Sequence, residues 1–310
     1  MLGHVTGVLI GFGIIGVVIA TGWVVARVDL LGPSAHRVLS RLVFFVLTPC
    51  LLFSTISHAD VHVLFSRLLL VSAIASLAAA VVGVVLLRLV LRRSAAETTI
   101  ATMGGSYVNA NNIGLPVATY VLGSATFVAP VLLFQLLVIT PVVLAVLDTV
   151  TNRGGGVGRA IARPLTNPLL IGSALGVLVA VTGVEVPAPV MQPFELVGGA
   201  AVPVVLLSFG MSLHGSRPLA AGSRRVDVLV STLLKLVLMP AVAWLVGALA
   251  FGLEGEELFV AVVLAGLPSA QNVFNYAQRY EVAVDTTRDT VLVTTVLSVP
   301  VLVVVAALLA

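Results

Sequence analysis

Charged residues are scarce in this chain: they make up only 9% of its 310 residues. A soluble domain carries about 25% charged residues. Because this number of charges is too small to cover a water-exposed surface, the composition excludes an ordinary soluble globular protein. Hydrophobic residues reach 59%, and the mean hydropathy is +1.18. The composition therefore indicates a protein that lies within a lipid bilayer.

Several chemical motifs are also absent. The single cysteine, Cys50, cannot form an intramolecular disulfide. Neither an HExxH metal motif nor a GxSxG nucleophile elbow occurs. The glycine-rich stretch at 153–159 lacks the Lys-Ser/Thr ending of a phosphate-binding loop. These absences argue against an enzyme or an ATPase, and we expect neither a cofactor nor a metal site.

Apolar runs long enough to cross a bilayer as helices, about 20 residues each, follow one another along the sequence. We predict an all-α membrane protein with ten transmembrane helices. They lie near 3–26, 36–57, 65–90, 97–121, 125–148, 166–183, 189–213, 227–251, 257–280 and 287–309. The first run is too long for a signal peptide and lacks a basic n-region and a cleavage site. We therefore count it as the first helix.

The arginines lie almost entirely in alternate connections between these predicted helices. The odd-numbered connections are rich in arginine, whereas the even-numbered ones hold only Arg67. By the positive-inside rule, the odd connections are cytoplasmic and both termini are extracytoplasmic. We predict a multi-pass protein of the cytoplasmic membrane. The net charge of +3 reflects these arginines, and we expect no nucleic-acid partner.

The two halves of the chain carry similar motifs. Gly-Leu-Pro occurs at 114–116 and at 266–268, and Pro49 and Pro141 have counterparts at Pro203 and Pro300. Chance alignment of the many prolines and glycines is the alternative. We favour two repeats, at 1–148 and 166–310, joined by a cytoplasmic linker at 149–165. Each repeat has five helices, an odd number, so the second must be inverted in the membrane.

The Gly-Leu-Pro motifs predict where two helices break. Proline removes a backbone donor and clashes with the preceding turn. Lipid cannot satisfy the freed groups, so such a break requires protein or a water-filled cavity around it. We predict breaks and crossing points at Gly114, Pro116, Gly266 and Pro268, in the fourth and ninth helices. Paired breaks of this kind indicate a transporter's binding site.

Three segments resemble the auxin efflux carrier family. They are LTPCLLFSTI at 47–56, NANNIGLP at 109–116 and LAGLPSAQNVFNYAQRY at 264–280. The resemblance implies ten helices in two inverted repeats, as in bile-acid/sodium symporters, with broken helices four and nine crossing near the membrane centre. It also implies a compact bacterial member, related to the plant PIN carriers. Auxin-like molecules and dicarboxylates such as malate or malonate stay open as substrates.

Amide side chains near the two breaks are the candidate ligands of an anion. The alternative is that these amides only satisfy unwound backbone. Ser54 is also a candidate, since the resembling carriers place polar groups there, and Gln135 would be costly in mid-helix unless it faced protein or a cavity. The candidate substrate-binding residues are Asn109, Asn112, Gln135, Ser54, Gln271, Asn272 and Asn275.

Lys235 is the only lysine in the chain and lies inside a predicted helix. A charge near the bilayer centre costs at least about 2.5–3.5 kcal/mol on insertion scales. We consider a countercharge for an anion or a support for the helix crossing. The alternative is that its side chain extends to the membrane surface.

Taken together, these features predict a secondary transporter that moves a small organic anion, such as a carboxylate, by alternating access. Coupling is either absent or carried by Na⁺ at backbone and amide oxygens. A channel-like facilitator is the first alternative and an intramembrane enzyme the second. The expected partners are the substrate and the lipid bilayer, and a homodimer is left open.

Overall fold

The computed structural model describes residues 2–58, 67–151, 168–215 and 224–309, with side chains from residue 13 onward. Within these ranges the chain is helical, and no β-strand is formed. The all-α prediction is therefore confirmed for the described residues. The predicted linker at 149–165 lies almost wholly outside them.

Six continuous helical segments are long and apolar enough to cross a membrane. They are Ala35–Ser57, Arg67–Val90, Ala125–Val150, Ala188–Leu213, Arg225–Ala250 and Val284–Leu309. Two shorter apolar helices, Gly13–Arg27 and Pro168–Thr182, match the first and sixth predicted spans. The fourth and ninth predicted spans are each interrupted part of the way along.

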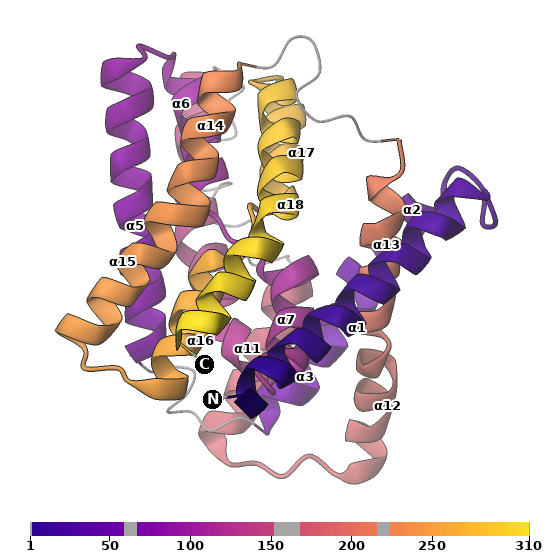
Figure 1. The fold of residues 1–310 in the computed structure, drawn as a ribbon. Helices are drawn as coiled ribbons and strands as arrows, with labels where there is room; N and C mark the ends of the chain where they lie inside the picture. Colours follow the sequence, from indigo (N-terminus) through magenta and orange to yellow (C-terminus); the bar gives the residue numbers. More distant parts are fainter. Residues whose placement is uncertain (1, 59–66, 152–167, 216–223, 310) are drawn as a thin grey trace.

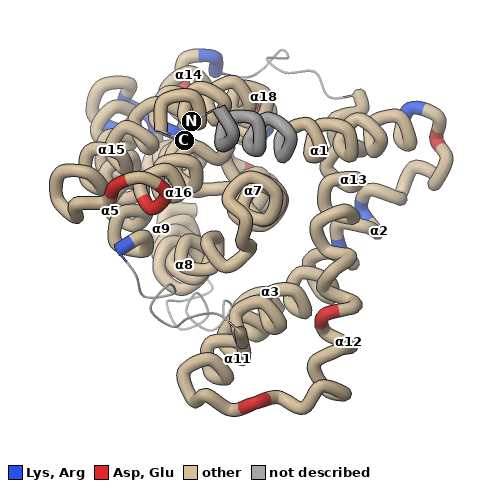
Figure 2. The backbone as a smooth tube through the Cα atoms, turned by 60° about the horizontal axis from the view of Figure 1, so that its bottom comes forward, with Lys and Arg blue, Asp and Glu red and all other residues tan. Residues whose placement is uncertain are grey.

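The helices form two lobes, which Figures 1 and 2 show from two directions. The smaller, which we call the flanking lobe, contains α1 (Leu2–Arg27), α2 (Ala35–Leu42), η1 (Val43–Leu47), α3 (Thr48–Ser57), α11 (Pro168–Thr182), α12 (Ala188–Gly199) and α13 (Ala201–Leu213). Glycines allow close helix packing here. A Cβ atom on Gly210 of α13 would lie 2.0 Å from the Ile19 carbonyl oxygen of α1, and one on Gly172 of α11 would lie 2.5 Å from the Pro49 carbonyl oxygen of α3.

The larger lobe contains both interrupted helices, and we call it the crossing lobe. Its elements are α5 (Arg67–Val84), η2 (Val85–Val90), α6 (Ala95–Ser106), η3 (Ala110–Gly114), α7 (Leu115–Tyr120), η4 (Ala125–Val128), α8 (Ala129–Phe134), η5 (Gln135–Ile139), α9 (Thr140–Val150), α14 (Arg225–Leu233), η6 (Leu234–Leu238), α15 (Met239–Leu245), η7 (Val246–Ala250), α16 (Gly255–Gly266), α17 (Gln271–Tyr280) and α18 (Val284–Leu309).

Four prolines are accommodated inside helical segments by a widened turn. The π-helical turns η1, η3, η5 and η6 each end two residues before a proline, namely Pro49, Pro116, Pro141 and Pro240. A proline ring clashes with the carbonyl of the preceding turn and provides no N–H. A local π turn is one of the adjustments that membrane helices use to re-satisfy their backbone. These prolines therefore do not end their segments.

A backbone pattern recurs in the crossing lobe at a spacing of 160 residues. Arg92 and Gly252 both have positive φ, at 53° and 59°. The residue after each donates its N–H to a carbonyl six residues back, from Arg93 to Leu87 and from Leu253 to Gly247. The helices that follow, α6 and α16, both have 12 residues. Figure 1 shows the α5–α6 turn at the top of the lobe and the α15–α16 turn at its bottom.

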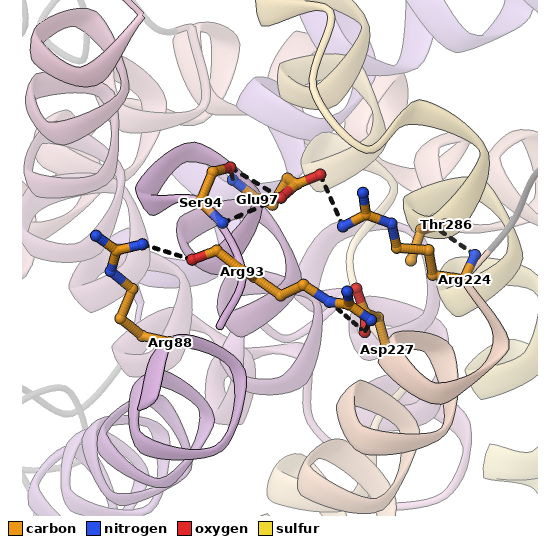
Figure 3. Close-up of polar contacts among 7 residues, drawn as sticks. All are labelled: Arg88, Arg93, Ser94, Glu97, Arg224, Asp227 and Thr286. Atoms are coloured by element: carbon orange, nitrogen blue, oxygen red, sulfur yellow. Dashed lines mark hydrogen bonds and ion pairs between the residues drawn. The ribbon is translucent and has the colours of Figure 1, made fainter. Parts of the chain in front are cut away.

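Ion pairs hold the upper end of the crossing lobe together (Figure 3). Arg93 contacts the buried carboxylate of Asp227 at 2.9 Å, and Arg224 contacts Glu97 at 2.8 Å. Ser94 and Glu97 form a capping box at the start of α6. The first turns of α6 and α14 are thereby joined at one end of the lobe.

Candidate binding site

The two helix interruptions lie side by side and pair through their backbones. The first spans Tyr107–Asn109, between α6 and η3, and the second spans Leu267–Ala270, between α16 and α17. The Asn109 N–H donates to the Pro268 carbonyl at 2.9 Å, and the Ala270 N–H donates to the Tyr107 carbonyl at 3.1 Å. Each break thus satisfies backbone groups of the other, as a break at membrane depth requires.

A side chain from a neighbouring helix supports each interruption. Gln135, which is 2% exposed, accepts from the Val108 N–H at 2.5 Å and donates to the Val108 carbonyl at 3.1 Å. At the second interruption, Thr294 accepts from the Ser269 N–H at 3.2 Å. Gln135 and Thr294 are 159 residues apart, the same spacing as Pro141 and Pro300. The amide of Gln135 is thus engaged with the backbone at the first break.

The position of the first break differs from the one expected from Gly-Leu-Pro. Gly114 ends the π turn η3, and Pro116 lies within α7, both beyond the interruption. Gly266 is the last residue of α16, and Pro268 lies inside the second interruption. A Cβ atom on Gly114 would lie 3.1 Å from Leu267. The first Gly-Leu-Pro therefore packs against the crossing, because a widened turn accommodates its proline.

Amide side chains follow both interruptions at equivalent positions. Asn111 and Asn112 lie 160 residues before Gln271 and Asn272. Asn111 Nδ2 donates to Asn112 Oδ1 at 2.9 Å, and Asn112 Nδ2 lies 3.4 Å from Gln271 Oε1. In this chain of amides the Nε2 group of Gln271 comes last, and no hydrogen bond from it is formed within the described residues. The structure therefore brings Asn112 and Gln271 together and leaves the two N–H groups of Gln271 Nε2 at the end of this series of amides.

Asn109 starts η3 and has one amide group without a partner. Its Oδ1 accepts from the Asn112 N–H at 3.1 Å. Its Nδ2 is buried and makes no hydrogen bond to the described residues. Asn109 lines a small cavity of about 30 Å³, and Asn111, Asn112 and Asn272 line both this cavity and a larger one. A buried donor without a partner is uncommon in proteins and needs a physical reason.

The larger cavity has a volume of about 630 Å³ and lies between the two lobes. One wall belongs to the crossing lobe and the other to the flanking lobe. The amides that line the first wall are Asn111, Asn112, Gln271, Asn272, Asn275 and Gln278, and the main polar residues of the second are His36, Arg37, Ser40, Arg41 and Ser208. Among the described residues that line it there is no Asp or Glu. The cavity is therefore polar and carries positive charge.

The flanking wall was not identified from the sequence. Ser208 matches Ser54 across the two halves, at a spacing of 154 residues, but only Ser54 is among the candidate substrate-binding residues predicted from the sequence. The structure places Ser54 away from the cavity, where its Oγ donates to the Leu51 carbonyl at 3.2 Å. Ser208 instead lies in the wall, 2.9 Å from Ser40 Oγ. The match between the halves could have indicated Ser208 as an equal candidate.

Lys235 lies in η6 and is completely buried. Its Nζ donates to the Ala265 carbonyl at 2.6 Å and contacts Met239 Sδ at 3.2 Å. Ala265 is in the last turn of α16, where carbonyls lack helical partners and the helix dipole is negative. Lys235 does not line the cavity. The structure therefore places its amino group at the end of a broken helix, where it supports the crossing.

Comparisons with known proteins match this chain to a family of membrane transport proteins and to individual proteins named as transporters. The family described as "Membrane transport protein" matches residues 13–156 and 157–306. A protein of Rhizobium meliloti (strain 1021), named "Putative malonate transporter", is 28% identical over 307 residues, which cover 96% of this chain and 93% of the relative. The "Uncharacterized transporter" of Methanothermobacter thermautotrophicus is 26% identical, covering 91% and 92%. The "Uncharacterized transporter YfdV" of Escherichia coli (strain K12) is 22% identical, covering 86% of each. The chain belongs to this family of membrane transport proteins, that of the auxin efflux carriers.

Proposed function

We propose that the protein is a secondary transporter that carries a small organic anion with at least one carboxylate across the cytoplasmic membrane. The observation that carries the proposal is the cavity between the lobes. One wall provides amide donors at the paired helix interruptions, and the other provides Arg37 and Arg41. With no carboxylate among its described lining residues, the cavity attracts anions and repels cations.

The N-terminus of α17 adds to this preference. The helix begins at Gln271 without a side-chain cap. The first N–H groups of a helix have no helical partners, and its positive dipole end favours an anion. Gln271 and Asn272, in the first turn, both line the cavity. A carboxylate at this position accepts hydrogen bonds from the amides and from the start of the helix.

We further propose that the ten predicted helices form two inverted repeats that alternate access. The support is the backbone pattern that recurs at 160 residues, with its turns at opposite ends of the crossing lobe (Figure 1). Two inverted repeats can adopt a second arrangement in which each repeat takes the conformation of the other. Movement between these two arrangements opens the site to one side of the membrane and then to the other.

The arginine distribution assigns the open side in this proposal. Arg37 and Arg41 lie in α2, at the start of the second predicted helix and next to the first connection, on the side that the positive-inside rule places in the cytoplasm. Both line the cavity. We therefore interpret this structure as the cytoplasm-facing state, with both termini outside and the site accessible from within the cell.

The experiment is a flux measurement on purified protein in proteoliposomes with a panel of labelled carboxylates, malonate among them. We expect saturable uptake and counterflow by the wild type. Asn112→Ala removes one link of the amide chain and lowers the apparent affinity about tenfold. Gln192→Ala is the matched control, because this exposed amide of α12 lies outside the cavity.

Each alternative function has its own outcome in the same assay. Uptake without saturation or counterflow would indicate a channel-like facilitator instead of a carrier. Chemical conversion of the substrate by purified protein would indicate an enzyme. Replacement of Na⁺ by choline decides whether Na⁺ drives transport. An anion carrier with an affinity unaffected by Asn112→Ala would overturn the site while leaving the class of function in place.

A further inference from the structure

A histidine of the flanking lobe faces the cavity opposite the crossing amides. His36 is half-buried in α2 and lines the cavity with Ser40 and Ser208. Its Nδ1 lies 2.9 Å from the Ser208 carbonyl oxygen and 3.2 Å from Ser208 Oγ. The imidazole is thus fixed by an element of the second half of the chain, 172 residues away.

The hydrogen bonds of His36 determine which nitrogen is left for a ligand. A carbonyl oxygen only accepts, so Nδ1 must carry the hydrogen and donate it to Ser208. Nε2 then bears a lone pair in the neutral ring and becomes a second N–H when the ring is protonated. Within the described residues, Nε2 has no hydrogen-bond partner. It is the only atom of the ring still able to bind a ligand.

The charged groups around His36 are of one sign. Arg37 and Arg41 lie on the same helix, and Tyr276 of α17 lies in the same cavity. The elements packed most closely against α2 are η1, which holds no titratable residue, and α13, whose His214 follows its last residue and contacts Trp23. No Asp or Glu lines the cavity within the described residues. A protonated His36 therefore lacks a negative partner until an anion enters.

We propose that the cavity takes a dicarboxylate, with one carboxylate at the crossing amides and the other at Nε2 of His36. The two groups line opposite walls of one cavity of about 630 Å³. The imidazolium form makes a charge-assisted hydrogen bond with the second carboxylate, so the bound dianion and the proton favour each other. This inference rests on the proposed carboxylate transport and adds the substrate class and the residue that selects it.

The chain contains a matched control for His36. His58 Nδ1 donates to the Ser54 carbonyl at 2.8 Å, and Ser54 is the counterpart of Ser208 in the first half. His58 is exposed and does not line the cavity. His58→Gln therefore removes the same kind of histidine–carbonyl contact without changing the cavity.

The test measures the binding of malonate and of its monoamide, malonamate, to purified full-length protein by titration calorimetry. The two ligands have the same length and differ by one carboxylate. At about pH 6.5 we expect the wild type to bind malonate about tenfold more tightly than malonamate. His36→Gln abolishes the preference, and His58→Gln keeps it.

The outcomes separate this inference from the proposed function. If wild-type protein binds the two ligands equally, or if His36→Gln retains the preference, the role of His36 is overturned, while binding that is sensitive to Asn112→Ala still supports carboxylate transport. If the wild type binds no carboxylate of the panel, both proposals fail. The comparison of two ligands on the wild type needs no variant, so a misfolded His36→Gln protein does not remove the test.

Discussion

The two helix interruptions perform the same structural task with different chemistry. At the end of α6 the Gly104 carbonyl accepts a hydrogen bond from the Ser269 hydroxyl. At the end of α16 the Ala265 carbonyl accepts one from the ammonium of Lys235. The first break is further held by both amide atoms of Gln135, and the second by the single hydroxyl of Thr294. The backbone pattern thus recurs in the two halves, while the side chains that support it differ.

Among the side chains that support the two interruptions, we expect substitution of Gln135 to have the largest effect on stability. Gln135→Leu leaves the Val108 N–H unpaired inside the protein and removes one of the two donors to the Val108 carbonyl, which keeps its hydrogen bond from the Ala110 N–H. An unpaired buried group costs about 1–3 kcal/mol and a lost hydrogen bond about 0.5–1.5 kcal/mol, so the free energy of unfolding falls by about 1.5–4.5 kcal/mol. Unfolding of the purified protein in detergent measures this change. A loss below about 1 kcal/mol would show that the first break does not depend on Gln135.

Lys235→Met is expected to have an intermediate effect. It leaves the carbonyl of Ala265, at the end of α16, without its donor, which lowers the free energy of unfolding by about 1–3 kcal/mol. Because Lys235 lies outside the cavity, substrate affinity should be unchanged while the transport rate falls. Binding and flux measured on the same preparation separate the two. A large loss of anion affinity would instead make Lys235 a countercharge for the substrate.

Thr294→Val should have the smallest effect of the three. The variant keeps the shape of the side chain but leaves the Ser269 N–H without its acceptor. We expect a loss of about 1 kcal/mol in the same unfolding measurement. A cost equal to that of Gln135→Leu would mean that both interruptions depend on their supporting helix to the same degree, and the difference between them would disappear.

Composition and hydropathy were enough to predict the helical class and most of the segments. Long apolar runs with arginines between them have few alternatives to membrane helices, and the six continuous segments coincide closely with predicted ones. The position of the first break could not be obtained in the same way. Pro116 has the same local sequence signal as Pro268, but a π turn accommodates one and not the other. Tertiary packing decides between these outcomes.

Only one wall of the candidate cavity can be predicted from the sequence. The amides of the crossing wall stand close together in the sequence, beside recognisable breaks, so the pattern indicated them. The flanking wall depends on His36 and Ser208, which lie 172 residues apart and meet only in the folded protein. Gln135 is a different case. Its cost in an apolar segment predicted that it faces protein or a cavity, and in the structure its amide contacts the backbone of Val108.

The widened turn η3 has a consequence for how a ligand is oriented. A turn of this kind adds a residue and rotates every later side chain by about 100° around the helix axis. The segment after the second break has no such turn at the equivalent place. Asn275 therefore lines the cavity, whereas Leu115, 160 residues earlier, is buried. A site made from two strictly equivalent segments would present the same groups to both ends of a ligand. The two segments here are not equivalent, so a ligand of the proposed transporter would bind in a preferred direction.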